Sequence, residues 1–114
     1  MSERYFTGKK AVVTGAGDGI GRALAQQLNS AGCELWLCDI DPGRLEETLA
    51  SLDGQKAAVH THIVDCGDQG AIVNWGRLVA GETDRLDAVF NNAGVAYGCL
   101  LYTSDAADEE DSVD

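Results

Sequence analysis

A glycine-rich segment contains the residues whose types and spacing most clearly predict chemistry. It lies between an apolar run, 11–13, and a helical pattern, 22–29, and reads Thr14-Gly15-Ala16-Gly17-Asp18-Gly19-Ile20-Gly21. Glycines at 15, 19 and 21 let a backbone turn sharply off a strand and approach a ligand with no side chain in between. Free backbone N–H groups and aligned peptide dipoles at the helix start favour an anion such as a pyrophosphate. The segment therefore predicts a phosphate cradle, although glycine-rich turns also occur where nothing binds.

An acidic residue lies where a dinucleotide site needs one. A second apolar run, 35–38, ends in Asp39, eighteen residues after Gly21. An acid at the tip of the second strand, about 20 residues beyond a glycine turn, accepts hydrogen bonds from an adenosine ribose. The alternative is a solvated strand end. The glycine turn and the acid together predict a dinucleotide more specifically than either does alone.

The spacing Thr-Gly-x-x-x-Gly-x-Gly resembles that of the short-chain dehydrogenase/reductase family. Two further motifs support the resemblance: Asp65 follows a third apolar run, 57–64, and Asn91-Asn92-Ala93-Gly94 follows a fourth, 86–90. The resemblance covers residues 6–98. It implies an oxidoreductase that transfers hydride between a nicotinamide cofactor and a small-molecule alcohol or carbonyl substrate, and a homo-oligomer as the full-length form.

The same resemblance implies a set of cofactor-binding residues. Asp65 would bond the adenine amino group with the Cys66 backbone beside it, and Ile20 would lie near the nicotinamide. Thr14 and Asn92 are expected instead to tie the loops to the strands through side-chain hydrogen bonds. The implied cofactor-binding residues are Gly15, Gly17, Asp18, Gly19, Ile20, Gly21, Asp39, Ile40, Asp65, Cys66, Asn91, Ala93 and Gly94, of which Asn91, Ala93 and Gly94 would line the adenosine ribose.

The sequence favours NAD over NADP. Asp39 places a carboxylate where the 2′-phosphate of NADP would lie, so charge repulsion and the loss of ribose hydrogen bonds both disfavour the phosphate. Relatives that prefer NADP tend to carry a basic residue just before the middle glycine or just after the second-strand acid. Here those positions hold Asp18 and Ile40. Asp18 is also a candidate helix N-cap, and the two roles are compatible.

The catalytic residues of the family are absent from their expected places. The family uses a Tyr four residues before a Lys, a Ser that orients the substrate oxygen and an Asn in a proton relay. Only Tyr5 and Lys9 have the Tyr-x-x-x-Lys spacing; Tyr5 precedes the first expected strand, and Gly8 lies between the two residues. We therefore expect an N-terminal fragment of an NAD(P)-dependent oxidoreductase that is inactive alone. The alternative is a non-catalytic dinucleotide-binding module.

Strands and helices are expected to alternate along the chain. Near-continuous apolar strands suit a parallel sheet covered on both faces, and right-handed crossovers give the strand order 3-2-1-4. This α/β arrangement is the N-terminal half of a doubly wound Rossmann fold. Asp41 before Pro42, and Asp68, are candidate helix starts. The expected elements are strands 9–14, 34–39, 57–64 and 86–91 and helices 19–31, 42–52 and 68–80.

Length, charge and cysteine content limit the classes of protein. A chain of 114 residues holds one domain at most, and its net charge of −11 argues against a nucleic-acid partner. The sequence has no apolar run long enough for a membrane span and no secretory signal, so a cytoplasmic protein without a membrane partner is expected. Four cysteines, at 33, 38, 66 and 99, show no metal-like spacing and are expected to be reduced packing residues or free thiols.

Histidine and tryptophan residues have two interpretations each. His60 and His62 share one strand face, which is more typical of a partly exposed surface than of a metal pair, since no third ligand with sensible spacing follows. Trp36 and Trp75 are expected to pack in the core or against a helix.

The C-terminal segment differs in composition from the rest. Six of the nineteen acidic residues lie in the last ten positions. Residues 99–109, Cys-Leu-Leu-Tyr-Thr-Ser-Asp-Ala-Ala-Asp-Glu, resemble one translated frame of a sequencing-library adapter. We therefore expect an NAD(P)-binding half-domain over 1–98 and a non-native acidic tail over 99–114. The alternative is an authentic, disordered acidic tail.

Overall fold

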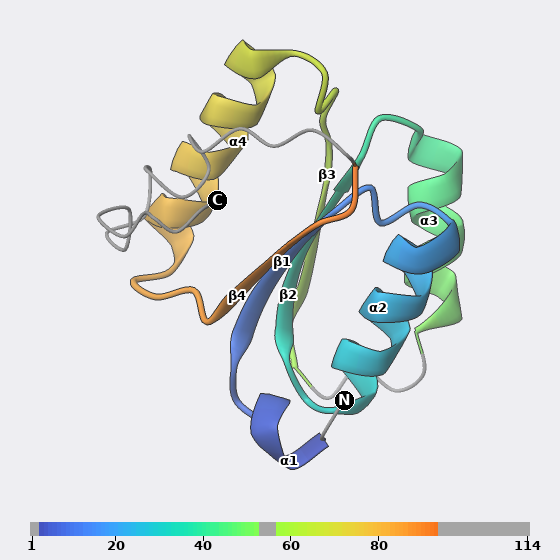
Figure 1. Ribbon diagram of the computed structural model, residues 1–114, viewed down its shortest axis with the longest axis vertical. Helices are drawn as coiled ribbons and strands as arrows, with labels where there is room; N and C mark the ends of the chain where they lie inside the picture. Colours follow the sequence, from blue (N-terminus) through green and yellow to red (C-terminus); the bar gives the residue numbers. More distant parts are fainter. Residues whose placement is uncertain (1–2, 53–56, 94–114) are drawn as a thin grey trace.

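The computed structural model describes residues 3–52 and 57–93. Seven of its elements match expected ones, with ends that differ by two residues or fewer, whereas the short first helix was not expected. The elements, which Figure 1 labels, are α1 (Glu3–Phe6), β1 (Lys10–Thr14), α2 (Gly19–Ser30), β2 (Glu34–Asp39), α3 (Pro42–Ser51), β3 (Val59–Ile63), α4 (Gln69–Glu82) and β4 (Ala88–Asn91).

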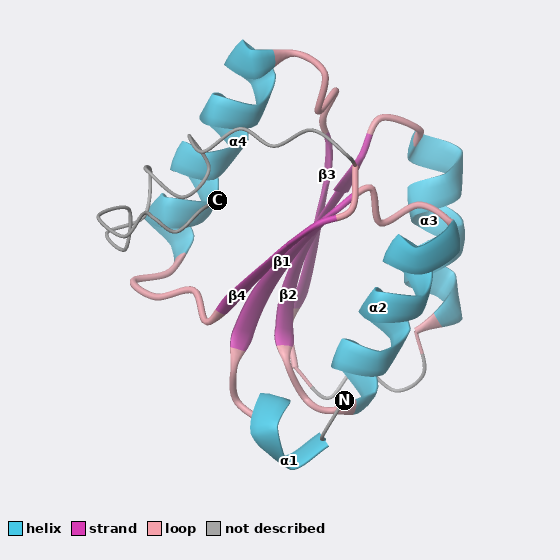
Figure 2. Ribbon diagram, in the orientation of Figure 1, coloured by secondary structure: helices cyan, strands magenta, loops and turns pink. Residues whose placement is uncertain are grey.

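The four strands form one parallel sheet in the order β3-β2-β1-β4. Val12 of β1 pairs with Trp36 of β2 on one side and with Val89 of β4 on the other. The α/β class and the strand order 3-2-1-4 are thus confirmed. Figure 2 shows the sheet between α4 on one face and α2 and α3 on the other. Helices on both faces explain why β1 and β2 are apolar throughout their centres.

Alternation along the strands divides the core into two clusters. On the α2 and α3 side, Val13 and Leu35 pack with Leu28 of α2 and Leu45 of α3. On the α4 side, Val12 and Trp36 pack with Ile72, Trp75 and Val79 of α4. Each fully buried side chain of this size stabilises the fold by about 1.5–3 kcal/mol. The expected core positions of Trp36 and Trp75 are confirmed, with 0% and 3% of their surface exposed.

Two helix starts are capped as expected. The Asp41 carboxylate accepts hydrogen bonds from Gly43 N at 2.9 Å and Arg44 N at 3.2 Å, and Pro42 occupies the first turn. Asp68 caps α4 in the same way, through two backbone amides of the first turn. Within the described part of the chain, no helix combines the length and apolar character needed to cross a bilayer.

Candidate functional site

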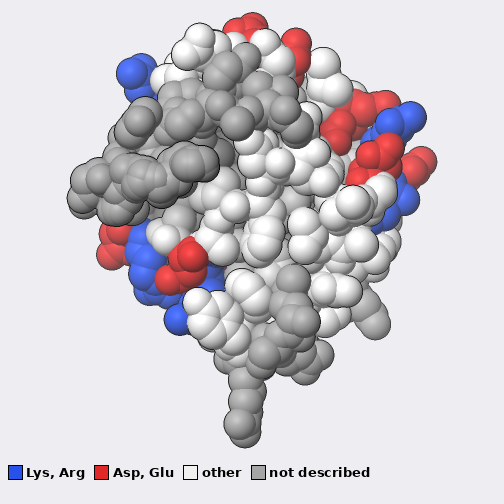
Figure 3. Space-filling model, in the orientation of Figure 1, with Lys and Arg blue, Asp and Glu red and all other residues white. Residues whose placement is uncertain are grey.

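A cleft of ≈ 300 Å³ opens at the carboxyl ends of the strands. Segments that follow all four strands line it, and ligands of open α/β sheets bind at this edge, where the direction of strand order reverses. Figure 3 shows charged side chains gathered near α3, at the upper right of the molecule, beside a largely uncharged central surface. The lining residues are Gly15, Asp18, Asp39, Ile40, Val64, Asp65, Cys66, Gly67, Asn92 and Ala93.

The glycine turn and the acid at the end of β2 are in direct contact. Asp39 Oδ2 accepts a hydrogen bond from Gly17 N at 2.8 Å, and Asp39 Oδ1 accepts one from Asp41 N at 3.0 Å. A Cβ atom at position 17 would lie 2.7 Å from Asp39 Oδ2. A side chain at this position would therefore push the carboxylate at the end of β2 away from the turn after β1.

A second close approach lies where α2 begins. A Cβ atom at Gly21 would collide with the Gly15 carbonyl oxygen and lie 2.8 Å from Asn92 Nδ2. Asn92 Nδ2 also donates a hydrogen bond to Gly15 O at 3.1 Å. The missing side chain at position 21 lets the helix start directly against the turn.

Thr14 and Asn92 have the structural roles expected of them. Thr14 Oγ1 donates a hydrogen bond to Asn91 Oδ1 at 2.9 Å and accepts one from Ala93 N at 3.2 Å. Together with the bond from Asn92 to Gly15, these contacts hold the loop after β4 against the end of β1. Of the motif residues, Asn92 and Ala93 line the cleft, Asn91 contacts Thr14, and Gly94 lies outside the described residues.

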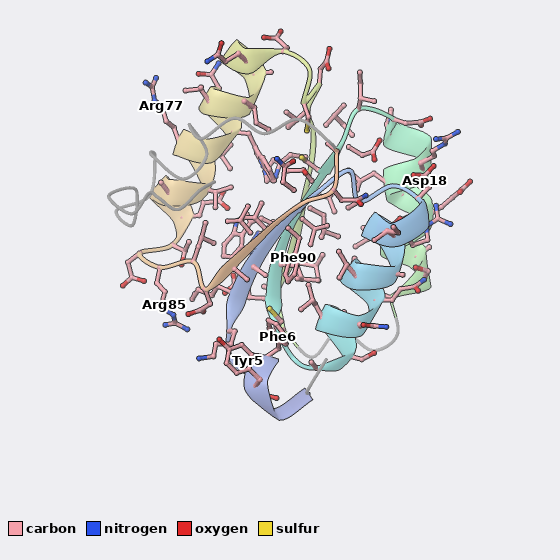
Figure 4. All side chains as sticks on the ribbon, viewed as in Figure 1. Tyr5, Phe6, Asp18, Arg77, Arg85 and Phe90 are labelled. Carbon is pink, nitrogen blue, oxygen red and sulfur yellow. The ribbon has the colours of Figure 1, made fainter. Side chains whose placement is uncertain are left out.

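Asp18 occupies the expected N-cap position of α2 without making the expected cap bond. Its backbone is extended, but its side chain caps no amide. Instead, Asp18 Oδ2 accepts a hydrogen bond from Arg44 Nη1 at 2.8 Å. Asp18 lies where α2 and α3 meet, at the upper right of Figure 4. The first-turn amides of α2 are consequently not satisfied by this carboxylate, unlike those of α3 and α4.

The remaining predicted residues differ in their exposure. Asp65 and Cys66 line the cleft after β3, and Asp65 Oδ1 accepts a hydrogen bond from Gly67 N at 2.9 Å. Ile40 lines it too and is 60% exposed, whereas Ile20 is 71% exposed on α2 outside the lining. Gly17, Gly19 and Gly21 also lie outside the lining, in the turn and the first turn of α2.

Sequence reasoning missed two residues behind the glycine turn. Thr48 of α3 has no exposed surface; its hydroxyl donates to Ala16 O at 2.8 Å and accepts from Arg22 Nε at 2.9 Å. Arg22 Nη2 also donates to Gly17 O. Thr48 follows Leu45 by three residues and so shares its apolar helix face. The polar side chain of Thr48 on that apolar face was the sequence feature that could have indicated its contact with the glycine turn.

Two pairs noted in the sequence do not line the cleft. Tyr5, labelled in Figure 4, lies in α1 at the opposite end of the sheet, with Lys9 Nζ 5.0 Å from its ring centre. His60 stacks on Trp36 with ring centres 4.7 Å apart, and His62 Nδ1 accepts a hydrogen bond from Trp75 Nε1 at 3.0 Å. Among the described residues, no three His, Cys, Asp or Glu side chains are grouped to hold a metal ion.

A family model described as short chain dehydrogenase matches residues 9–114. The chain belongs to the short-chain dehydrogenase/reductase family. Among curated relatives of this family, estradiol 17-beta-dehydrogenase 11 of Homo sapiens is 39% identical over 101 residues, covering 89% of this chain and 34% of the relative. The 17-beta-hydroxysteroid dehydrogenase 13 of Mus musculus is 38% identical over 107 residues, covering 94% and 34%. The chain thus spans about a third of the length of these relatives.

Solved structures of the family share the fold. NAD+-bound xylitol dehydrogenase has a TM-score of 0.72 at 32% identity, over 78% of this chain and 34% of that one. A metagenomic short-chain oxidoreductase in complex with NADP has a TM-score of 0.72 at 32% identity, over 84% and 42%. These two short-chain dehydrogenase/reductase structures hold different nicotinamide cofactors on one fold.

Proposed function

We propose that this chain is the cofactor-binding N-terminal part of an NAD(P)-dependent oxidoreductase that transfers hydride between a nicotinamide and an alcohol or carbonyl substrate. The observation that carries the proposal is the Asp39 carboxylate beside the glycine turn. It accepts hydrogen bonds from Gly17 N and Asp41 N. A carboxylate accepts about four hydrogen bonds, so two acceptor positions remain for the hydroxyls of a ribose.

The residues around the cleft fit the successive parts of a dinucleotide. In this proposal, Asp39 and Ile40 bind the adenosine ribose, with Asn91, Ala93 and Gly94 nearby. Asp65 and Cys66 bind the adenine, and Ile20 lies near the nicotinamide. The pyrophosphate is assigned to the turn residues Gly15, Gly17, Asp18, Gly19 and Gly21. The bound cofactor supplies the hydride donor or acceptor, and these residues bind and orient it.

The proposed pyrophosphate position is supported by the backbone amides at the start of α2. The first N–H groups of a helix have no partner inside the helix, and the helix dipole favours an anion there. Asp41 and Asp68 satisfy such amides in α3 and α4, but Asp18 pairs with Arg44 instead. The first turn of α2 is therefore the helix start best suited to bind a phosphate from outside the chain.

We favour NAD as the cofactor. A 2′-phosphate beside Asp39 would be repelled by the carboxylate and would replace the hydroxyl that it bonds. Arg44 is a neighbouring cation that could offset this repulsion. Its guanidinium already lies 2.8 Å from Asp18 Oδ2 and 3.6 Å from Asp41 Oδ2. Two carboxylates therefore compensate the charge of Arg44 before any cofactor binds.

Catalysis is assigned to residues outside this chain. The family's Tyr-x-x-x-Lys spacing occurs here only at Tyr5 and Lys9, in and just after α1, and α1 lies at the end of the sheet away from the cleft. We therefore propose that the 114 residues bind cofactor without catalysing hydride transfer. Resequencing the source DNA across the Gly98 codon tests this assignment. A frame that continues through Tyr-x-x-x-Lys supports a longer oxidoreductase, whereas a gene that ends as printed supports a binding module.

Nucleotide titration tests the cofactor site. We expect the full chain to bind NAD+ more tightly than NADP+, and Asp39→Asn to weaken NAD+ binding about tenfold, because a hydrogen bond to a charged group contributes about 1.5–3 kcal/mol. The same variant should bind NADP+ more tightly than the wild type does. Asp84→Asn, which removes the same charge from an exposed loop, is the matched control and should change neither affinity. Tighter wild-type binding of NADP+ would overturn the preference, and binding of neither nucleotide by a chain that circular dichroism shows to be folded would overturn the site.

A further inference from the structure

Two cysteine thiols meet at one wall of the cleft. Cys38 is the second-to-last residue of β2, directly before Asp39, and none of its surface is exposed. Cys66 lies in the turn after β3, is 9% exposed and lines the cleft. Their sulfur atoms are 3.7 Å apart, and both cysteines are free thiols. Cys66 thus borders the cleft, and Cys38 is fully buried beside it.

We propose that Cys38 and Cys66 are an oxidation site, in which hydrogen peroxide that enters the cleft converts the two thiols to an intramolecular disulfide and thereby weakens nucleotide binding. The first half of this proposal depends only on the two cysteines and the cleft. The second half rests on the proposed function, because it assigns a nucleotide to the same cleft. Neither half concerns the hydride-transfer reaction.

The pKa values of the two thiols are shifted in opposite directions, and peroxide oxidation needs one thiol to ionise more readily. A hydrogen bond from Cys38 lowers the pKa of the Cys66 thiol, although partial burial opposes the shift. The same hydrogen bond, followed by burial, raises the pKa of the Cys38 thiol. This hydrogen bond therefore favours the thiolate at Cys66, which lines the cleft, over the thiolate at Cys38. Thiolates, rather than thiols, attack peroxides.

The reaction proceeds in two steps that balance. The Cys66 thiolate attacks one peroxide oxygen, so that an S–O bond forms, the O–O bond breaks and hydroxide leaves, which a proton converts to water. The Cys38 sulfur then attacks the sulfenic acid at Cys66; the S–S bond forms, the S–O bond breaks and a second water leaves with the Cys38 proton. Two thiols are oxidised, and one hydrogen peroxide is reduced to two waters.

The expected effect on the cleft follows from where the two cysteines are held. Disulfide formation brings the sulfurs from 3.7 Å to about 2 Å. Cys38 is fixed within the sheet, and its carbonyl accepts a hydrogen bond from Ala16 N at 3.0 Å. The movement therefore falls on the turn at 65–67, where the structure holds Gly67 N to Asp65 Oδ1. That turn forms the wall assigned to the adenine.

Cys33 provides a control thiol in the same fold. It is fully buried in the cluster on the opposite face of the sheet, with Leu28 and Leu35. Burial, with the charges of Asp87 and Glu34, raises the pKa of the Cys33 thiol to about 11. A thiol that is protonated and has no access to the cleft should not react with peroxide on the same timescale.

Peptide mapping of the oxidised full chain tests the first half. The chain is reduced, treated with hydrogen peroxide, alkylated and digested, and the peptides are analysed by tandem mass spectrometry. We expect a linked Cys38–Cys66 peptide that dithiothreitol reverses, that Cys66→Ser abolishes and that Cys33→Ser leaves in place. Oxidation of Cys66 to sulfinic acid without the linked peptide, or linkage of Cys66 to another cysteine, would overturn the proposal.

Nucleotide titration of the same samples tests the second half. NAD+ should bind the oxidised chain about tenfold more weakly than the reduced chain, and dithiothreitol should restore the affinity. Equal affinities for mapped, oxidised protein and for reduced protein would overturn the effect on binding. Absence of NAD+ binding to the reduced chain would overturn the proposed function and this second half with it, while the peptide map would still decide the oxidation site.

Discussion

Gly17 N donates a hydrogen bond to Asp39 Oδ2 over 2.8 Å, which joins the turn after β1 to the carboxylate that ends β2. The two residues are distant in the sequence and become neighbours because β1 and β2 are adjacent and parallel. A side chain at position 17 would displace the carboxylate. The contact joins the glycine turn to the Asp39 carboxylate, so a change at either residue should affect both parts of the proposed site.

The close contact at Gly21 predicts a large cost for any side chain there. Gly21→Ala should lower the free energy of unfolding by about 3 kcal/mol, because the new methyl group would overlap the Gly15 carbonyl in a packed turn. Urea denaturation measures the change. Gly81→Ala is the matched control: position 81 is in α4 with no atom within 4 Å of the new Cβ, so alanine should stabilise by up to about 1 kcal/mol. Equal effects of the two substitutions would contradict the packing argument.

Thr48 predicts that the glycine turn depends on a residue of α3. Thr48→Val keeps the shape of the side chain but removes the hydroxyl between Ala16 O and Arg22 Nε. Leaving these buried groups without that partner should cost about 1–3 kcal/mol in chemical denaturation. Thr61→Val, at a half-buried position of β3, should change the stability by less than about 0.5 kcal/mol. A neutral Thr48→Val would show that the hydroxyl does not support the turn.

The Glu34 carboxylate predicts a pH-dependent contribution to stability. Hydrogen bonds from His60 Nε2 at 2.9 Å and from Lys10 Nζ at 3.0 Å hold the pKa of Glu34 below its ordinary 4.5, with the His60 bond as the largest cause. A carboxyl group whose pKa is lower in the folded state stabilises the fold above its unfolded-state pKa. This contribution is lost as the pH falls through the lower, folded-state pKa.

Denaturation of the wild type and Glu34→Gln between pH 7 and pH 3 measures this contribution. The difference should be about 0.5–1 kcal/mol at neutral pH, as for partly exposed ion pairs, and should shrink below pH 4.5. Glu46→Gln removes the same charge from an exposed position of α3 and corrects for net charge. A difference that stays constant down to pH 3 would argue against the assigned hydrogen bonds.

The ion pair between Asp18 and Arg44 predicts a change in cofactor preference. Asp18→Asn should free the Arg44 guanidinium, which could then interact with a 2′-phosphate near Asp39. Exposed pairs contribute up to about 1 kcal/mol, so the ratio of NADP+ to NAD+ affinity should rise up to about fivefold. Titration of Asp18→Asn and of Asp18→Asn/Arg44→Ala separates the two residues. If the double variant keeps the raised ratio, Arg44 is not its cause.

Because β4 is an edge strand, we expect the isolated residues 1–98 to aggregate or to be only marginally stable. Within the described part of the chain, β4 pairs only with β1, and its Val89 and Phe90 are half-buried. An unpaired sheet edge promotes association with other chains. Residues 1–98 should therefore aggregate in a concentration-dependent way or unfold at low denaturant, which sedimentation and thermal melts would show. A monodisperse sample with a sharp cooperative melt would contradict this expectation.

The sequence predicted the fold wherever local patterns and sheet burial agree. β2 begins and ends as expected because its apolar run is bounded by Gly32 and by Asp39. The edge strands β3 and β4 are shorter than expected, since an apolar run does not show how many of its residues a single neighbouring strand pairs. The four residues of α1 are too few to produce a helical period.

The sequence predicted the candidate-site residues that lie in local motifs, but it did not predict the side-chain contacts between distant segments. The glycine turn and Asp39 follow from spacing, and the structure brings them together. The partner of Asp18 did not follow, because Arg44 approaches only when α3 packs beside α2. Thr48 was missed for the same reason: its hydroxyl meets the turn through tertiary packing, and no local motif encodes that contact.

The segments that line the cleft lie at the carboxyl ends of the strands, whereas the described connections that lead into β1, β2 and β4 lie at the other end of the sheet. Figure 1 shows α1 and the start of β2 at that second end. One end of the sheet therefore carries the proposed cofactor site, and the other carries α1 and the described connections that lead into β1, β2 and β4. Insertions, purification tags or surface attachments belong at the second end, where the length of a connection can change without moving an atom of the cleft.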